Sequence, residues 1–337
     1  MALSRRRLIA IALFLFVAIA LLYVAAPAVA GIEETWDRLR DGDPWWLAGA
    51  FALEVLSFAS YMALFRAIVV PGPDGGGWLA SYRITMAGLA ATRLLATAGA
   101  GGVVLTVWAL RRSGMAARTV ARRYATFLGL LYGVYMASVI LVGVGLAAGV
   151  LPGPSPVVLT VVPAVAAGLV TATALGVSVG VDELGDPAGS AGGRGGGSAR
   201  ARALLGSVPA TIASGVRGGI QALREPRPGL LGALGWWAFD IAVLWACFRA
   251  FGDSPEVAVV VISYFVGMAA NTLPIPGGIG GIEGGMVGCF TVFGVPAGLA
   301  LVAVLSYRAF ALWIPLVPGV IAYFQLLRTA TGSDHVQ

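Results

Sequence analysis

The sequence predicts an all-α polytopic membrane protein, an inverted repeat with about six full spans and two re-entrant helical hairpins. Its composition is the first reason: 58% of its 337 residues are hydrophobic and only 11% are charged. Soluble domains carry about a quarter charged residues. The other two reasons are broken apolar segments and the placement of the arginines.

Eight apolar segments can be counted, at 8–30, 45–70, 79–110, 122–149, 157–180, 229–251, 257–294 and 297–328. A helix needs about 20 apolar residues to cross a bilayer. Segments 79–110 and 257–294 are long for one crossing and short for two, and glycine or proline interrupts both. Each is therefore expected to be a re-entrant hairpin. Segment 8–30 exceeds a signal-peptide core, so we expect an uncleaved span, with cleavage after Ala30 as the alternative.

The arginines predict the orientation, because positive loops stay in the cytoplasm. If 79–110 returns to the side it entered from, the cluster that follows it is cytoplasmic: Arg111, Arg112, Arg118, Arg122 and Arg123. The outer loops then hold mostly acids: Glu33, Glu34, Asp37, Asp41, Asp43, Asp253 and Glu256. The expected location is a bacterial inner membrane, with both termini cytoplasmic.

Short repeated motifs predict two related halves within one transmembrane domain, 1–337. Phe65-Arg66-Ala67 recurs as Phe248-Arg249-Ala250, and Ser81-Tyr82 recurs as Ser263-Tyr264. Each half, about 45–149 and about 229–328, contains a span, a broken segment and another span. Three spans separate the hairpins, so the halves have opposite orientations, as in many secondary transporters. Each leading span carries one acid, Glu54 or Asp240.

The connector 181–228 combines a flexible linker with an amphipathic helix. GSAGGRGGGS, at 189–198, has linker composition. Apolar residues then recur every four positions, at Leu204, Val208, Ile212, Val216 and Ile220. This pattern predicts a helix on the cytoplasmic leaflet, or alternatively one packed beneath the bundle.

The stretch NTLPIPGGIGGIEGG, at 271–285, is the centre of the predicted site. Pro274 and Pro276 stop one helix, and the next would begin near the bilayer midplane with unpaired N–H groups and a positive dipole end. Ala98-Gly99-Ala100-Gly101-Gly102 is expected to do the same in the first hairpin. Two such helix ends facing one centre would attract an anion.

Charged residues near the breaks complete this candidate site. Arg93 and Arg308 supply positive charge, and Glu283 needs a partner, for which Arg308 is the first candidate. Glu283 is also the candidate for a proton-linked role. The predicted substrate-binding residues are Arg93, Gly99, Gly101, Gly102, Pro276, Gly277, Gly278, Gly280, Glu283 and Arg308. The alternative is structural: glycines that pack helices and a buried Glu283–Arg308 ion pair.

Catalytic chemistry is not expected. The only histidine, His335, lies in the tail, and Cys247 and Cys289 lie in apolar segments without a disulfide or metal pattern. No nucleotide-binding motif is present, and we expect no cofactor and no metal. The expected partners are membrane lipids with an anionic headgroup and no nucleic acid; a second copy or an envelope-biosynthesis enzyme is left open.

Two C-terminal segments are similar to a known family. LPIPGGIGGIEGGMVGCFTVFGVP (273–296) and LSYRAFALWIPLVPG (305–319) resemble the signature of the lysylphosphatidylglycerol synthase transmembrane (flippase-like) family, and GAGGVVLTVWALRRSGM (99–115) resembles its first-half motif. The motif positions that carry over are Pro276, Gly277, Gly278, Gly280, Glu283 and Arg308. The first-half break, TRLLATAGAGG, has no proline and, apart from Arg93, none of the charged residues of many relatives. The resemblance therefore does not imply a charged gate on that side.

The resemblance implies a lipid translocase. Bifunctional members join this membrane region to an aminoacyl-transferase domain and are implicated in moving the charged lipid between leaflets. Only nine residues follow Arg328, so we expect no lipid aminoacylation by this polypeptide. The expected function is translocation of a phosphate-bearing phospho- or glycolipid. The alternatives are a non-transporting scaffold for envelope-lipid enzymes and, less favoured, an enzyme acting on a lipid phosphate.

The topology can be tested with single cysteines placed at Arg112 and Asp253 in a variant lacking Cys247 and Cys289. A membrane-impermeant maleimide should label position 253 in intact cells and position 112 only after the membrane is opened. Labelling of both positions from the same side would contradict the predicted orientation.

Overall fold

The computed structural model describes residues 41–71, 77–94, 100–183, 197–225, 227–272 and 278–332. Every regular element within these residues is helical. Five of the described helices are long and apolar enough to cross a membrane: 44–68, 117–147, 161–180, 228–251 and 297–326. The all-α polytopic class is therefore confirmed. The first predicted span, 8–30, lies outside the described residues.

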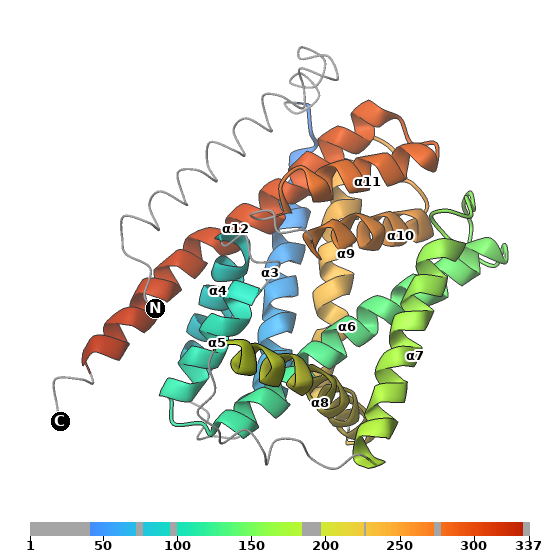
Figure 1. The fold of residues 1–337 in the computed structure, drawn as a ribbon. Coiled ribbons are helices and arrows are strands. Elements are labelled where there is room, and N and C mark those ends of the chain that lie inside the picture. Colours follow the sequence, from blue (N-terminus) through green and yellow to red (C-terminus); the bar gives the residue numbers. More distant parts are fainter. Residues whose placement is uncertain are drawn as a thin grey trace.

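Two leading helices, α3 (Pro44–Ile68) and α9 (Leu231–Phe251), lie side by side near the centre of the molecule (Figure 1). Asp43 begins α3 by accepting the Trp45 N–H at 2.8 Å, the usual role of an N-cap carboxylate. A short 3₁₀ helix, η2 (Pro228–Leu230), precedes α9. Gly232 allows close packing, since a Cβ there would lie 2.9 Å from the backbone nitrogen of Leu64.

The first broken segment forms two helices, α4 (Gly77–Leu94) and α5 (Ala100–Arg112). Gly88 faces Thr106, and Gly102 faces Thr92. Thr92 follows Gly88 on α4, whereas its partner Gly102 precedes Thr106 on α5. The two helices therefore run antiparallel. Glycine at both contacts brings the helix backbones close together.

The second broken segment also forms two main helices. They are α10 (Val257–Met268), extended by the 3₁₀ helix η3 (Ala269–Thr272), and α11 (Gly281–Val292). Gly267 lies against Met286 where these helices pack together. Gly278 and Gly280, just before α11, have φ angles of 66° and 85°, which favour glycine.

The hairpin of each half packs against a helix of the other half. Helix α4 packs along α12 (Ala297–Gly332), while α10 packs against α6 (Ala117–Ala147). Each hairpin thus contacts the last span of the other half, and the α4–α5 and α10–α11 pairs lie on different sides of α3 and α9 (Figure 1). The order of elements is the same in both halves. The inverted orientation of the repeat stays a prediction.

Helix α8 (Gly197–Arg224) packs against α6 and α7 (Val161–Glu183). The contact uses small residues: Gly215 lies against Ala125 of α6. Arg217 Nη1 donates to the Ser178 carbonyl at 2.9 Å. Ile212 and Ile220, from the predicted apolar stripe, are exposed, and the predicted position of this helix on the cytoplasmic leaflet stays a prediction. The predicted linker lies outside the described residues except for 197–198, which begin α8.

The close α4–α12 contact predicts a position-specific effect of adding a methyl group. A Cβ at Gly319 would lie 2.7 Å from the Met86 carbonyl oxygen, whereas Gly133 on α6 has no atom within 4 Å of that position. Gly319→Ala should destabilise the protein by about 1–3 kcal/mol through overpacking. Gly133→Ala should be neutral or stabilise by up to about 1 kcal/mol. Thermal unfolding in detergent measures both; equal melting temperatures would contradict the close contact.

Candidate functional site

A cluster of buried polar side chains lies where six helices meet. Its members come from α3, α4, α9, α10, α11 and α12, and we name it the central polar cluster: Glu54, Arg93, Asp240, Tyr264, Glu283, Tyr307 and Arg308. The three carboxylates and Arg308 are each at most 8% exposed. Charges buried within a membrane are costly and mark functional sites by default.

Glu283 and Arg308 form an ion pair within this cluster. Arg308 Nε donates to Glu283 Oε1 at 2.7 Å, so Arg308 is the partner that the sequence suggested. Glu283 Oε2 accepts the Gly280 N–H, also at 2.7 Å. Glu283 is the third residue of α11, where a glutamate commonly folds back onto the N-cap.

This arrangement corrects one expectation. The N-terminus of α11 was expected to offer unpaired N–H groups to an external anion. The structure instead places the Glu283 carboxylate on the Gly280 N–H and satisfies the same carboxylate with Arg308. An internal anion already occupies this helix end, so an incoming phosphate must compete with Glu283 there.

Arg93, in the last turn of α4, is the second cation of the cluster. Its guanidinium carbon lies 5.6 Å from the centroid of the Phe58 ring, within cation–π range. It interacts electrostatically with Glu54, Asp240 and Arg308. Arg93 Nη1 is buried and has no hydrogen-bond partner among the described residues. Arg93 therefore brings an enclosed donor to the centre of the protein.

Asp240 on α9 accepts several hydrogen bonds. The Tyr307 hydroxyl donates to Asp240 Oδ2 at 3.0 Å, and the Tyr264 hydroxyl donates to the same oxygen. Glu54 also interacts electrostatically with Asp240. Glu54 Oε2 is buried without a hydrogen-bond partner in the described part of the chain. The acids of the two leading spans therefore lie near each other.

The ends of the two hairpins also come together. Ile279, just before α11, packs with Ala90 and Leu94 at the end of α4 and with Leu316 and Val320 of α12. The described residues that flank the two breaks therefore pack together through apolar side chains.

The described glycines of the predicted site allow close packing or donate a backbone N–H. Gly101 and Gly102 lie in the first turn of α5, and Gly102 packs against Thr92 and Gly88 of α4. Gly278 packs against Ile282, and Gly280 donates its N–H to Glu283. Gly99, Pro276 and Gly277 lie outside the described residues.

Four members of the cluster were missing from the predicted site. Glu54 and Asp240 were visible in the sequence as one acid per leading span, but their proximity was not. Tyr264 lies in the repeated Ser-Tyr motif, and Tyr307 directly precedes Arg308.

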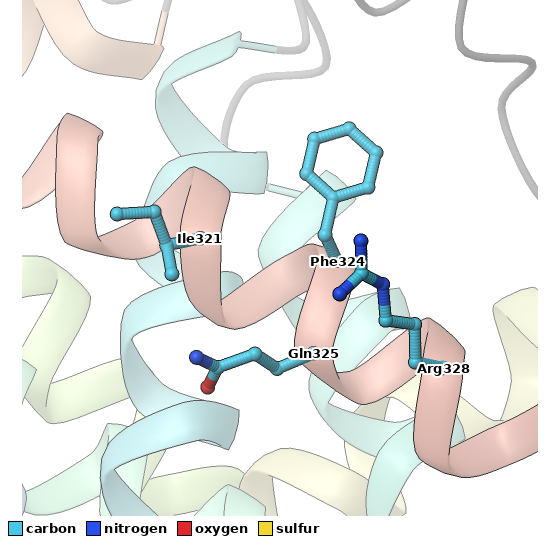
Figure 2. Close-up of a pocket in the computed structure, with 4 residues that line it drawn as sticks. All are labelled: Ile321, Phe324, Gln325 and Arg328. Carbon is cyan, nitrogen blue, oxygen red and sulfur yellow. The ribbon is translucent and has the colours of Figure 1, made fainter.

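A cavity of about 490 Å³ lies elsewhere, along the C-terminal part of α12. Ile321, Phe324, Gln325 and Arg328 line it (Figure 2). Gln325 Oε1 accepts from Arg83 Nε of α4 at 2.9 Å. Because a helix rises about 1.5 Å per residue, this cavity begins roughly 20 Å along α12 from Arg308. It is separate from the central polar cluster.

Comparison with known proteins identifies the family. The family model of the lysylphosphatidylglycerol synthase TM region matches residues 8–319. The chain belongs to this family. It is therefore a multi-pass membrane protein of the lysylphosphatidylglycerol synthase TM-region family, as its motifs and apolar helices indicated.

Two relatives are UPF0104 membrane proteins of Methanothermobacter thermautotrophicus. One is 39% identical over 95 residues, covering 28% of this chain and 27% of the relative. The other is 34% identical over 86 residues, covering 25% and 26%. The matched part of the chain spans about a quarter of the length of each relative. No solved structure matches the chain.

The ion pair predicts non-additive effects on stability. Glu283→Ala and Arg308→Ala should each destabilise by about 3–5 kcal/mol, because either change leaves a buried charge without its partner. Glu283→Gln should cost less than Glu283→Ala, since an amide oxygen can still accept the Gly280 N–H. Thermal unfolding of the two alanine variants and their double variant provides the test. Additive losses would show that the two side chains are energetically independent.

Proposed function

We propose that this protein translocates a phosphate-bearing phospho- or glycolipid across a bacterial inner membrane and catalyses no covalent reaction. Arg308, which is buried, and Arg93, whose Nη1 atom is buried, carry the proposal. A fold gains little stability from buried ion pairs that apolar packing could replace. Retaining two arginines at the centre is better explained by an anion that passes through it.

Arg93 is the better docking group for that anion. Its Nη1 donor is buried without an acceptor in the described residues, and such a donor costs about 1–3 kcal/mol, more when charged. A phosphate oxygen would satisfy it with a charge-assisted hydrogen bond. Arg308 adds positive charge nearby and would gain contact with the phosphate as Glu283 is displaced.

The packing of the hairpins suggests how such a headgroup enters. Ile279 of one hairpin packs against Ala90 and Leu94 of the other through apolar contacts. Contacts of this kind can separate without breaking hydrogen bonds. Rocking of one half against the other would expose the cluster to each leaflet in turn, while the acyl chains stay in the bilayer.

Family membership supports a role in lipid handling. The family takes its name from the membrane region of lysylphosphatidylglycerol synthase, whose lipid carries a phosphate headgroup. The two relatives are described only as UPF0104 membrane proteins, which states no substrate. The proposal therefore specifies a phosphate-bearing headgroup and leaves its further chemistry to experiment.

Reconstitution in liposomes tests the proposal. Fluorescent anionic, aminoacylated and polyprenyl-phosphate lipids are supplied, and a membrane-impermeant quencher reports how fast each changes leaflet. At least one lipid should move faster than in empty vesicles. Arg93→Gln should slow it about tenfold or more, because a charged hydrogen bond contributes about 1.5–3 kcal/mol.

The matched control is Arg249→Gln, at an exposed arginine that pairs with Asp253, and its rate should equal that of the wild type. If no lipid moves faster than in empty vesicles, the translocase proposal fails. A lipid synthase that co-purifies with the inactive protein would then favour the scaffold function.

A further inference from the structure

We infer that the cavity beside Phe324 and Arg328 binds one anionic phospholipid, with its phosphate at Arg328 and the start of its acyl chains at Ile321 and Phe324. This lipid site is separate from the central polar cluster, because the two lie roughly 20 Å apart along α12. The inference goes beyond the proposed function, since a lipid held here need not be one that the protein moves.

The cavity lies across the end of the membrane span that α12 forms. The part of this helix that is long and apolar enough to cross a membrane is Ala297–Leu326. Ile321 and Phe324 lie within that part, whereas Arg328 lies just beyond it. Ile321 and Arg328 are about 10 Å apart along the helix axis. The headgroup layer of one leaflet is about 5–8 Å thick, so the cavity extends from the headgroups into the hydrocarbon.

The lining of the cavity changes from apolar to polar in the same direction. Its residues are spaced i, i+3, i+4 and i+7, so they share one face of α12: Ile321, Phe324, Gln325 and Arg328. Figure 2 shows Ile321 at one end of this row and Arg328 at the other. A phospholipid has the same order of groups, with carbon chains followed by a phosphate. A volume of about 490 Å³ is within the range of ligand sites and would hold the headgroup and the upper part of the chains.

The charge of the surrounding helices favours an anion. Helices α4 and α12 pack against each other. Together they carry four arginines and no acid: Arg83, Arg93, Arg308 and Arg328. Arg83 Nε donates to the lining residue Gln325 at 2.9 Å, which brings a second guanidinium near the polar end of the cavity. An arginine has five N–H donors, so Arg83 and Arg328 can each donate to a phosphate in addition to their other partners. Basic pockets between transmembrane helices bind anionic headgroups in other membrane proteins.

An arginine at the end of a membrane span also has a simpler explanation. Its side chain can extend to the membrane surface and contact the headgroups of any nearby lipids. That explanation does not account for the cavity, or for the hydrogen bond that links Arg83 of α4 to Gln325 in its lining. The two explanations differ in one measurable respect, because only a specific site holds an acyl chain against Phe324.

A lipid at this site would link the two halves of the protein. Arg83 belongs to the hairpin of the first half, and Arg328 belongs to the last span of the second half. A phosphate that accepts from both would strengthen the contact between α4 and α12. Anionic phospholipid should therefore raise the melting temperature, since a ligand that binds only the folded state stabilises it.

Photo-crosslinking of the purified full-length protein in detergent tests the site. The probe is a phosphatidylglycerol with a diazirine near the start of one acyl chain, and mass spectrometry locates the labelled peptide. The wild type should be labelled at or next to Ile321 and Phe324. Arg328→Gln should weaken this labelling about tenfold, the effect of losing one charge-assisted hydrogen bond. Arg328→Lys keeps the charge and should retain part of the labelling.

The matched control is Arg249→Gln, which removes an exposed arginine at the end of α9, and its labelling should equal that of the wild type. Labelling confined to other peptides, or equal labelling of the wild type and Arg328→Gln, would overturn the inference. A phosphatidylcholine probe that labels the site as strongly would refute the preference for an anionic lipid. Displacement of the probe by inorganic phosphate would refute a lipid as the occupant. Because binding is measured in detergent, these outcomes do not depend on whether the protein moves lipids.

Discussion

The cost of burying charge inside a membrane is the constraint on which the rest of this structure depends. Three acidic and two basic side chains from five helices lie together at its centre. Arg308 balances Glu283, and two tyrosines donate to Asp240. The helices that supply these groups cannot move independently without exposing a charge to the apolar interior.

Small residues make that arrangement sterically attainable. Gly232 lets α9 approach α3, and Gly319 lets α12 approach α4. These contacts set the distance between the acids of the leading helices and bring Arg93 near them. The glycine-rich composition is thus linked to function indirectly, through helix separation. The glycines of 278–280 serve a different purpose, because their positive φ angles turn the chain into α11.

Much of the fold followed from the sequence because it depends on local properties. The length of apolar segments located the five described spans, and glycine and proline located both breaks. The Glu283–Arg308 pair was also suggested, since a buried acid requires a cation. The hydrogen bond between Glu283 and the N-terminus of α11 also has a local signal. A glutamate three residues after an N-cap commonly accepts the N-cap N–H, and Glu283 lies three residues after Gly280.

Other features depended on how the helices cross. The electrostatic interaction between Glu54 and Asp240 joins residues far apart in the chain. The α3–α9 crossing that brings them near each other depends on glycines, which give no strong hydropathy signal. The packing face of α8 depends on helix crossing in the same way: glycine and alanine make its contact with α6, while Ile212 and Ile220 are exposed.

The central claim is that a phosphate headgroup binds between the two halves at Arg93 and Arg308. A cryo-electron microscopy structure in nanodiscs of the transported lipid tests it most directly. We expect headgroup density within hydrogen-bonding distance of Arg93, with the Glu283 carboxylate displaced from Arg308. Headgroup density confined to other sites, such as the cavity beside Phe324 and Arg328, with the Arg93 donor still unoccupied, would contradict it.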